Sequence, residues 1–378
     1  MVPLLNKRKE SFVIGIVLTF FFYGNAYPAP MVTNVTGSFS RGGSATIAGS
    51  SFGTKSTAGP LVWENFEAGS LNSAIRGTAP AVSNIGGSWT WQATDSGGPV
   101  FSNSVVRPNS TKSSKHDYAS TYSNGLFVNT QLPSYFFSFW WYYHPVTGWS
   151  RNTKPFILSR NTNDDSPNAY IGFGQYPGDP GIRTEVIDGG GAIDQTTWGS
   201  TAINSIANRW IRFDVWLVQS SVNVKDGKFQ VFVHNPDSGS PVVLDLQINP
   251  AKTRTTSNTW GSLFLQTYSS IDGGTSQTVY IDDFYLDSTQ ARVEICDKST
   301  WASKTHCEIQ IPTSWSASSI TFNVNSGSFA TLNGAFLYVV DKDGGVNSNG
   351  YVIGSSSPPP TTPPPQLTPL SPIIKSIQ

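Results

Sequence analysis

Alternation of apolar and polar side chains is the main pattern in this sequence, and it is clearest between Trp210 and His234. Side chains two positions apart on a β-strand share a face. One face of this segment is purely apolar and consists of Ile211, Phe213, Val215, Leu217, Phe229, Val231 and Val233. The segment therefore predicts two antiparallel strands with one face in a core, joined by a turn at Asp226-Gly227, a dipeptide that tight hairpins prefer.

The opposite face of the same two strands is mixed in character. It carries Trp210, Arg212, Asp214, Trp216, Gln230, Phe232 and His234. Large aromatic rings beside charged groups are unusual on a merely solvated surface. We therefore interpret this face as one that contacts a ligand.

Short strand-like runs separated by turn signals continue on both sides of this hairpin. They lie at 126–128, 135–143, 156–159, 169–173, 182–187, 242–247, 263–268 and 279–286. No segment keeps apolar residues at helical spacing for long. Many short strands at such intervals are typical of a sandwich. Residues 59–290 therefore predict one antiparallel β-sandwich jelly roll within an all-β protein.

Composition supports the strand-rich interpretation and narrows the functional classes. The 378 residues include 12 Trp and 35 Gly, and aromatic residues make up 13% of the chain. Aromatic and glycine-rich sequences with few helix formers favour strands and turns. Charged residues are only 13% and the formal net charge is zero. This argues against a nucleic-acid partner, because nucleic-acid-binding proteins need a basic surface.

Both ends of the chain have the composition of segments outside a folded domain. Basic residues 7–9, the apolar run 12–23 and small residues up to Ala26 predict a signal peptide of residues 1–26. An uncleaved N-terminal anchor is the alternative. Residues 355–378 are rich in proline and predict an extended spacer or a disordered terminus. We expect a secreted or cell-surface protein with no membrane span once the signal peptide is removed.

The two cysteines, Cys296 and Cys307, lie in two strand-like runs joined by a polar connection. In the oxidising environment outside the cell we expect them to form a disulfide that closes this hairpin. A metal site that includes the adjacent His306 is the alternative, but two thiols and one histidine at this spacing match no zinc pattern.

Two short segments near the ends of the chain share the features of one small domain. A Gly-rich turn precedes the corner GSSFG at 49–53, and the run WSASSI at 315–320 leads into a strand. These motifs resemble the IPT/TIG immunoglobulin-like family. The resemblance implies that residues 27–58 and 291–354 form one small Ig-like β-sandwich, split by insertion of the jelly roll. Two separate modules in tandem are the alternative.

The strands at 135–144, 182–187 and 263–268 also carry polar side chains opposite apolar ones. If they are neighbours of the central hairpin in one sheet, a single concave groove collects their polar and aromatic side chains. This set is Trp140, Tyr142, His144, Arg183, Glu185, Arg212, Trp216, His234, Gln266 and Tyr268. Aromatic planes bind the apolar faces of sugar rings, and the polar groups bind sugar hydroxyls. The set therefore predicts a carbohydrate-binding groove.

The run RWIRFDVWLV followed by DGKFQVFVHN resembles the hairpin of the concanavalin A-like jelly rolls, which include lectins, laminin-G-like modules and polysaccharide lyases. The run GIRTEV resembles the Arg-Ser/Thr-Glu strand of alginate-lyase-like enzymes. That resemblance implies β-elimination on a uronate polymer, in which Arg183 and Gln266 neutralise the carboxylate. Tyr268, His144 or His234 would remove the C5 proton. The chain lacks the Gln-Ile-His strand and the Tyr-x-Lys-x-Gly run of these enzymes.

Acidic residues offer one further candidate site. No pair has the spacing of a glycosidase strand. Glu64, Glu67, Asp282 and Asp283 lie on the two acidic-aromatic runs at the ends of the inserted segment, and we expect these runs to pair. Carboxylate oxygens are the ligands that Ca²⁺ prefers, so a structural calcium site is a candidate cofactor site. The pattern DKDGG at 341–345 lacks EF-hand spacing and predicts a turn.

Simpler interpretations stay open for all of these residues. Histidines are often structural or solvated, the Arg183–Glu185 pair is also consistent with a surface ion pair, and aromatic stripes fill cores. Three functions remain. The first is recognition of an extracellular polysaccharide, and the second is a polysaccharide lyase that cleaves a uronate polymer. The third is a non-catalytic surface module that contacts other cell-surface proteins.

Overall fold

The computed structural model describes residues 28–92, 98–118, 125–129, 131–145, 151–161, 165–173, 182–198, 207–235, 244–270 and 277–354. Within these ranges the regular elements are antiparallel β-strands, apart from one short 3₁₀ turn at Trp301–Ser303. This confirms the predicted all-β fold class. The expected signal peptide and proline-rich tail lie outside the described residues. No helix in the described ranges has the length and apolar character needed to cross a membrane.

Nine strands of the described chain form the larger sheet of the sandwich. In spatial order its main path is β16 (Leu244–Ala251), β15 (Gly227–His234), β14 (Trp210–Val218), β9 (Ser134–Pro145), β18 (Gln277–Asp287), β3 (Val62–Glu64) and β4 (Val82–Ser83). The strand β7 (Ser113–Tyr118) pairs with the other end of β18 and with β6 (Val100–Ser102). The pairing of β3 with β18 is the one expected for the two ends of the inserted segment.

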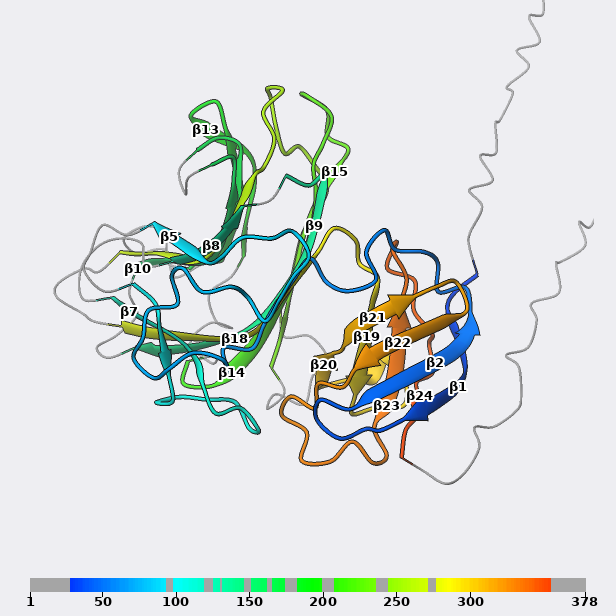
Figure 1. The fold of residues 1–378 in the computed structure, drawn as a ribbon. Coiled ribbons are helices and arrows are strands. Elements are labelled where there is room, and N and C mark those ends of the chain that lie inside the picture. Colours follow the sequence, from blue (N-terminus) through cyan, green and yellow to red (C-terminus); the bar gives the residue numbers. More distant parts are fainter. Residues whose placement is uncertain are drawn as a thin grey trace, which may run out of the picture.

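Seven strands form the facing sheet. Their spatial order is β13 (Gly191–Trp198), β12 (Ile182–Asp188), β11 (Asn168–Phe173), β10 (Arg151–Ser159), β17 (Ser262–Ser270), β8 (Gly125–Asn129) and β5 (Thr90–Gln92). Figure 1 shows the two sheets as the layers of a sandwich. The layered arrangement confirms that the large central segment forms an antiparallel β-sandwich.

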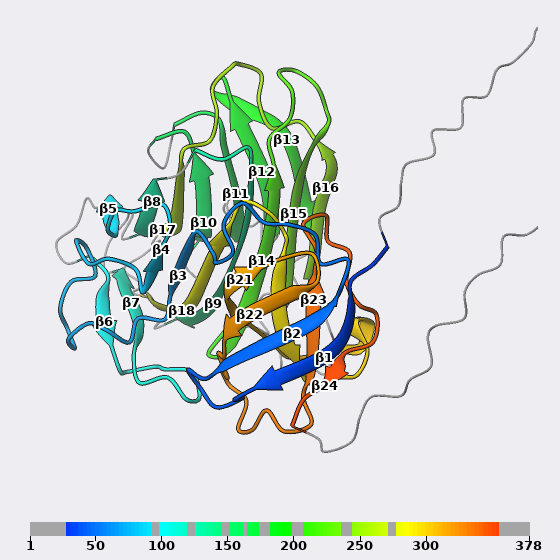
Figure 2. The ribbon, with the colours of Figure 1, turned by 45° about the vertical axis from the view of Figure 1, so that its right-hand side comes forward.

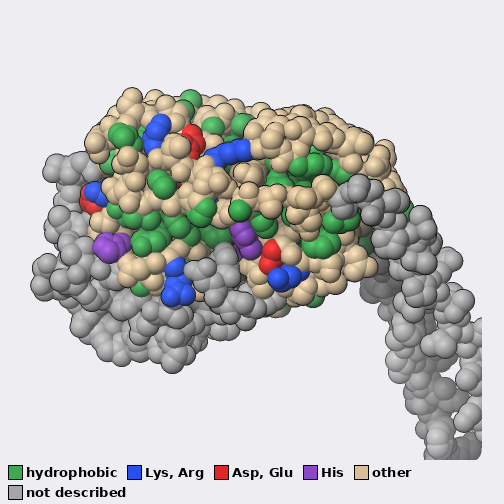
Figure 3. All heavy atoms as spheres, turned by 90° about the horizontal axis from the view of Figure 1, so that it is seen from below, with side chains coloured by type: hydrophobic (Ala, Val, Ile, Leu, Met, Phe, Trp, Pro, Cys, Tyr) green, Lys and Arg blue, Asp and Glu red, His purple; other side chains and the backbone are tan. Residues whose placement is uncertain are grey.

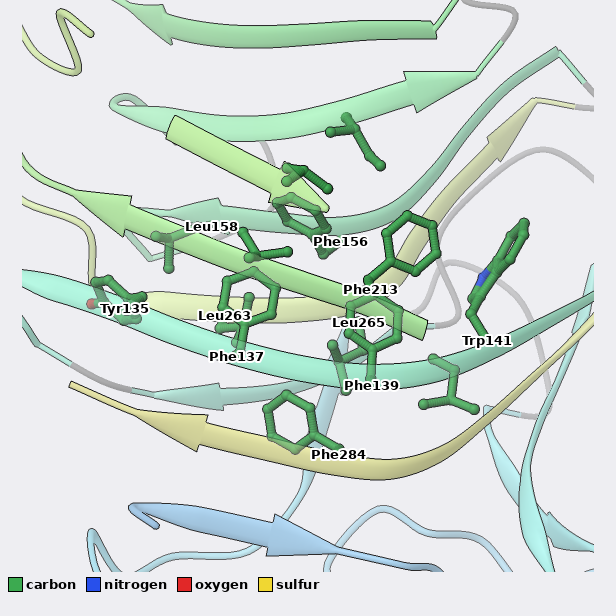
Figure 4. Packing of buried hydrophobic residues seen from close by; sticks show 14 of the residues in the cluster. Tyr135, Phe137, Phe139, Trp141, Phe156, Leu158, Phe213, Leu263, Leu265 and Phe284 are labelled. Atoms are coloured by element: carbon green, nitrogen blue, oxygen red, sulfur yellow. The ribbon is translucent and has the colours of Figure 1, made fainter. Parts of the chain in front are cut away.

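The space between the two sheets is filled by the apolar faces of their strands. Figure 4 shows aromatic members from both sheets: Tyr135, Phe137, Phe139, Trp141, Phe156 and Phe213. The ring centroids of Phe137 and Phe156 lie 5.0 Å apart in an edge-to-face arrangement, which is favourable for aromatic pairs. Every apolar residue predicted on the core face of the central hairpin is fully buried, so that part of the prediction is confirmed.

The connection of the central hairpin is longer than the predicted tight turn. The strand β14 ends at Val218 and β15 begins at Gly227, so residues 219–226 join them. The backbone N–H of Ser221 donates to Asp226 Oδ1 at 2.7 Å and closes this loop. Gly227 is needed for a close approach, because a Cβ there would lie 2.5 Å from the Val218 carbonyl oxygen. The Asp-Gly pair therefore marks the start of a strand.

A smaller unit contains strands from both ends of the described chain. One of its sheets has the order β1 (Met31–Gly37), β2 (Ser44–Ser50), β22 (Ser319–Asn323) and β21 (Ile311–Trp315). The other has the order β20 (Cys307–Ile309), β19 (Arg292–Cys296), β23 (Phe336–Val340) and β24 (Tyr351–Val352). Ile47 and Phe52 share its core with Ile295 and Phe322. We call this unit the small sandwich, and its membership of the IPT/TIG family stays a prediction.

The small sandwich packs on the outer face of the nine-stranded sheet. Figures 1 and 2 show it beside β9, β14 and β18 in two views. The apolar part of this contact consists of Trp63, Phe136, Trp216, Tyr285, Ile309 and Ile311. The contact covers much of the sheet face that carries the mixed residues of the central hairpin.

Charged side chains are sparse on the face seen in Figure 3. The described part of this face consists mostly of uncharged polar side chains and backbone, with scattered apolar side chains. Several charged residues are instead buried, namely Arg107, Arg212, Asp214, Asp283, Glu294 and Glu308. Because burying a charge is unfavourable unless it is paired, the partners of these residues identify their roles.

Candidate functional site

The polar face of β9 and β14 is largely an internal surface. Arg212 is 3% exposed and Trp140 is 4% exposed, because the small sandwich lies over them. Arg212 Nε and Nη2 donate to the two carboxylate oxygens of Asp214 at 2.8 and 2.9 Å. Its Nη1 donates to Glu294 Oε2 at 3.1 Å and to the Cys307 carbonyl oxygen at 3.0 Å. One guanidinium thus joins the nine-stranded sheet to β19 and β20.

The charges around Arg212 compensate one another. Burial acts to raise the pKa of Asp214, but the charges of Arg212 and His234 outweigh it and hold that pKa well below its ordinary value. His234 Nε2 lies 3.0 Å from Asp214 Oδ2. In Glu294, burial is likewise outweighed by Arg212 and Arg292, and the pKa is lowered. This network therefore holds the two units in place, and Arg212 is not an open ligand-binding residue.

The two tryptophans expected to form a sugar platform are also covered. The guanidinium of Arg107 lies over Trp140, with its carbon 4.0 Å from the ring centroid. Arg107 in turn forms ion pairs with Asp283 and Glu308. Trp216 is 9% exposed, belongs to the apolar contact described above and lines a cavity between the two units.

Tyr142 and His144 are the more exposed of the predicted residues on β9. His144 is exposed, and its Nδ1 lies 2.6 Å from Asn208 Oδ1. Tyr142 is half-buried beside the rings of Trp210 and Tyr280, at centroid distances of 5.5 and 6.0 Å. Burial raises the pKa of Tyr142, so its hydroxyl stays protonated at neutral pH and is poorly suited to act as a base.

Arg183 and Glu185 occupy the outer face of the other sheet. The strand β12 belongs to the seven-stranded sheet, whereas β9 and β14 belong to the nine-stranded sheet. The outer faces of the two sheets of a sandwich point in opposite directions. The structure therefore does not bring Arg183 and Glu185 into one groove with Arg212, which corrects the single groove predicted from alternation.

Gln266 faces the core instead of the surface. Its φ of 49° interrupts the alternation on β17, and the register against β10 shifts in the same stretch, as in a β-bulge. Trp141 Nε1 donates to Gln266 Oε1 at 2.8 Å within the core. Gln266 is thus not positioned to neutralise a substrate carboxylate. The backbone of Tyr268 pairs with Lys154, and its side chain lies outside the described residues.

A compact polar cluster is present on the outer face of the seven-stranded sheet. The Tyr170 hydroxyl donates to Glu185 Oε2 at 2.5 Å, and Lys154 Nζ lies 4.0 Å from the centroid of the Tyr170 ring. Arg183 lies two residues before Glu185 and shares its face. Tyr170 and Glu185 are buried, whereas Lys154 and Arg183 are half-buried. We call these four residues the Tyr170 surface.

Strand register brings the Tyr170 surface together. Tyr170 on β11 is the direct partner of Glu185 on β12, and Gly172 is the partner of Arg183. Directly opposed side chains have Cβ atoms about 4.5–5.5 Å apart. Because Gly172 has no side chain, the position on β11 directly opposite Arg183 carries none. The neighbouring apolar residue Phe264 packs with Tyr170 on the same outer face and restrains the tyrosine ring.

Two of the carboxylates considered for calcium have protein partners of their own. Glu64 accepts hydrogen bonds from the Phe66 backbone N–H at 2.7 Å and from Trp89 Nε1 at 3.2 Å. Burial raises the pKa of Glu64, and these hydrogen bonds act against the increase. Glu67 accepts from the Thr111 backbone N–H at 2.8 Å and from the Thr111 hydroxyl. Both side chains therefore hold nearby loops.

The other two carboxylates lie on β18. Asp283 is paired with Arg107, and its backbone N–H donates to Asp282 Oδ1 at 2.8 Å. Burial and the neighbouring Asp283 charge raise the pKa of Asp282 well above its ordinary value. The four carboxylates do not converge on one point in the described part of the chain. Calcium binding by these residues stays a prediction.

Cys296 and Cys307 form the predicted disulfide across β19 and β20. Over the described residues, the one group of three close potential metal ligands is Glu294 with Cys296 and Cys307. Because the two sulfurs are bonded to each other, this group is a disulfide beside a buried carboxylate.

We compared the chain with known proteins. No family model matches it, and no curated protein matches it. Alginate lyase Aly36B is similar in structure, with 13% identity, a TM-score of 0.41 and coverage of 61% of this chain and 97% of its own. The cellulose induced protein Cip1 has 14% identity and a TM-score of 0.38, with coverage of 60% of this chain and 97% of its own. Lectin II from Ulex europaeus has 12% identity and a TM-score of 0.32, with coverage of 60% of this chain and 99% of its own. Likenesses at this level carry no functional argument.

The residues that sequence reasoning missed are Lys154 and Tyr170. Tyr170 lies within an otherwise apolar run, between the core residues Ala169 and Ile171. The alternation rule applied to that run would have placed its side chain outward. Lys154 lies before a register shift on β10, so alternation alone gives no reliable face for it.

Proposed function

We propose that this protein binds an acidic polysaccharide through the Tyr170 surface. The observation that carries this proposal is the grouping of Lys154, Tyr170, Arg183 and Glu185 on the adjacent strands β10, β11 and β12. Side chains on regular strands hold their positions better than side chains on loops. Such a surface suits a polymer that presents the same groups repeatedly.

The chemistry of the Tyr170 surface fits uronate residues. The Lys154 ammonium and the Arg183 guanidinium are cationic donors for a sugar carboxylate. The buried Glu185 holds the Tyr170 hydroxyl, so the half-buried cations are the groups that would contact the polymer. Arg107 and Arg212 are almost fully buried at the other sheet, under the small sandwich, so they offer no comparable surface.

A lyase that acts on the same polymer is the second candidate. β-Elimination needs a cation that neutralises the uronate carboxylate and a group that accepts the C5 proton. Arg183 fits the first requirement. The Tyr170 hydroxyl lies on the same surface, with the Glu185 carboxylate 2.5 Å away as a proton acceptor. This arrangement favours Tyr170 over the residues named by the family resemblance.

Titration calorimetry with alginate and polygalacturonate tests the binding proposal. We expect Lys154→Met and Arg183→Met each to lower the affinity about tenfold or more, because a hydrogen bond to a charged group contributes roughly 1.5–3 kcal/mol. Added salt should weaken binding, because the cations lie near the surface. A neutral glucan should bind much more weakly.

Arg76→Met is the matched control, because Arg76 is an exposed arginine in the loop before β4. Its affinity should equal that of the wild type. Unchanged affinity in both Lys154→Met and Arg183→Met would contradict the proposal. Formation of an unsaturated uronate, measured by its ultraviolet absorbance, would favour the lyase. Loss of that product in Tyr170→Phe with retained affinity would assign catalysis to Tyr170.

A further inference from the structure

A cavity of about 370 Å³ lies between the nine-stranded sheet and the small sandwich. This volume is within the range of small-molecule sites. The residues that define its chemistry are Phe136, Asp214, Trp216, His234, Arg292, Trp301 and Lys304. The lining residue Ala302 is exposed, so the cavity opens to solvent. We call this cavity the seam pocket.

Aromatic rings from four elements line the seam pocket. Phe136 lies on β9, Trp216 on β14, Phe232 on β15 and Trp301 in the 3₁₀ turn. The Trp216 Nε1 atom is buried and has no hydrogen-bond partner in the described chain. Buried tryptophan N–H groups normally have an acceptor. The atom itself is closed to solvent, so the ring of Trp216, and not its N–H group, forms part of the pocket wall.

Lys304 supplies a cation that lacks a carboxylate partner among the described residues. Its ammonium lies 3.7 Å from the Trp301 ring centroid and donates to the Trp301 carbonyl oxygen at 3.4 Å. The neighbouring Arg292, by contrast, is paired with Glu294 at 2.5 Å. Burial lowers the pKa of Lys304 to about 8, although the charges of Glu294 and Asp214 oppose the decrease. A ligand anion would compensate the Lys304 charge.

We propose that the seam pocket binds a single acidic sugar residue, with its carboxylate on Lys304 and its ring against the aromatic walls. Sugar rings present apolar C–H faces to aromatic planes, and a carboxylate forms a charge-assisted hydrogen bond with an ammonium. The seam pocket and the Tyr170 surface lie on opposite outer faces of the large sandwich. They are separate sites, and this inference does not depend on the proposed function.

Titration calorimetry with glucuronate tests the proposal, with glucose as the uncharged comparison. The wild type should bind glucuronate at least tenfold more tightly than glucose. Lys304→Met should lower glucuronate affinity about tenfold or more, because it removes the ion pair and keeps an apolar chain of similar length. Trp216→Ala removes a ring from the wall, and we expect a several-fold loss.

The pH dependence of binding provides a readout that a merely structural role would not change. The charged and titratable groups around Lys304 are Arg212, Asp214, His234, Arg292, Glu294 and His306. Because its pKa is about 8, the ammonium loses its proton as the pH rises through that value. Glucuronate affinity of the wild type should therefore fall above pH about 8. Lys304→Arg keeps its charge there and should retain binding.

Two sets of variants separate the seam pocket from the Tyr170 surface. The double variant Lys154→Met with Arg183→Met should bind glucuronate like the wild type, and Lys304→Met should bind polysaccharide like the wild type. Circular dichroism and thermal unfolding establish that each variant is folded. Absence of glucuronate binding by the wild type, or equal affinity in folded Lys304→Met, would overturn the proposal.

Discussion

Buried charges with partners in separate elements are the main feature at the scale of single residues. Arg212 on β14 donates to Asp214 on its own strand and to Glu294 on β19. The planar guanidinium presents several donors in a rigid fork, so it can bind two carboxylates at once. Loss of such a cation leaves carboxylates buried without compensation. The free-energy cost of these unpaired charges is larger than the stabilisation that the intact pair contributes.

Arg212→Met should therefore lower the free energy of unfolding by about 3–5 kcal/mol. Urea denaturation followed by tryptophan fluorescence measures the change. Arg76→Met, at an exposed site, should remain within about 0.5 kcal/mol of the wild type. A loss below about 1 kcal/mol in Arg212→Met would show that the ion network is not needed to hold the two units together.

At the scale of elements, β17 shows how a bulge changes the face of a residue. Alternation predicts that Gln266 lies outward with Phe264, but a positive φ turns its side chain into the core. The reason is the indole N–H of Trp141, which needs an acceptor between the sheets. A strand pattern read from sequence contains no sign of this requirement, because Trp141 belongs to a strand of the other sheet.

Gln266→Ala should destabilise the protein by about 1–3 kcal/mol, since it leaves the buried Trp141 N–H without its acceptor. Chemical denaturation of the single variants and of the double variant with Trp141→Phe forms a double-mutant cycle. The coupling should be favourable, because the two residues are in direct contact. Strictly additive losses would be inconsistent with a hydrogen bond that contributes to stability.

At the scale of the whole molecule, residues distant in sequence meet where the small sandwich contacts the large one. Arg107, from the loop after β6, pairs with Asp283 on β18 and with Glu308 on β20. Burial acts to raise the pKa of Glu308, but Arg107 and His306 outweigh it and lower the pKa to about 2. The contact between the two units is therefore linked to protonation of this carboxyl.

Replacement of Glu308 by Gln should lower stability by about 3 kcal/mol at neutral pH, because each unit of pKa difference corresponds to roughly 1.4 kcal/mol. The folded pKa of Glu308 lies below its unfolded value. The stabilisation contributed by the Glu308 charge is thus fully present above the unfolded pKa and is lost as the pH falls through about 2. Urea unfolding of both proteins from neutral to acidic pH measures this trend. A difference that stays constant with pH would exclude the Glu308 charge as its source.

The sequence by itself indicated many of the strands, the apolar face of the central hairpin and which two cysteines are bonded. These features are local, because alternation follows from the two-residue period of a strand and the disulfide joins neighbouring strands. Only the tertiary structure decided which sheet each strand enters and what covers its polar face. Pairing of β2 with β22 joins residues 44–48 to residues 319–323. The family resemblance assigned these two segments to one domain, but no local pattern shows that this unit packs over Arg212 and Trp216. Nor does one show that Arg183 and Glu185 belong to the other sheet.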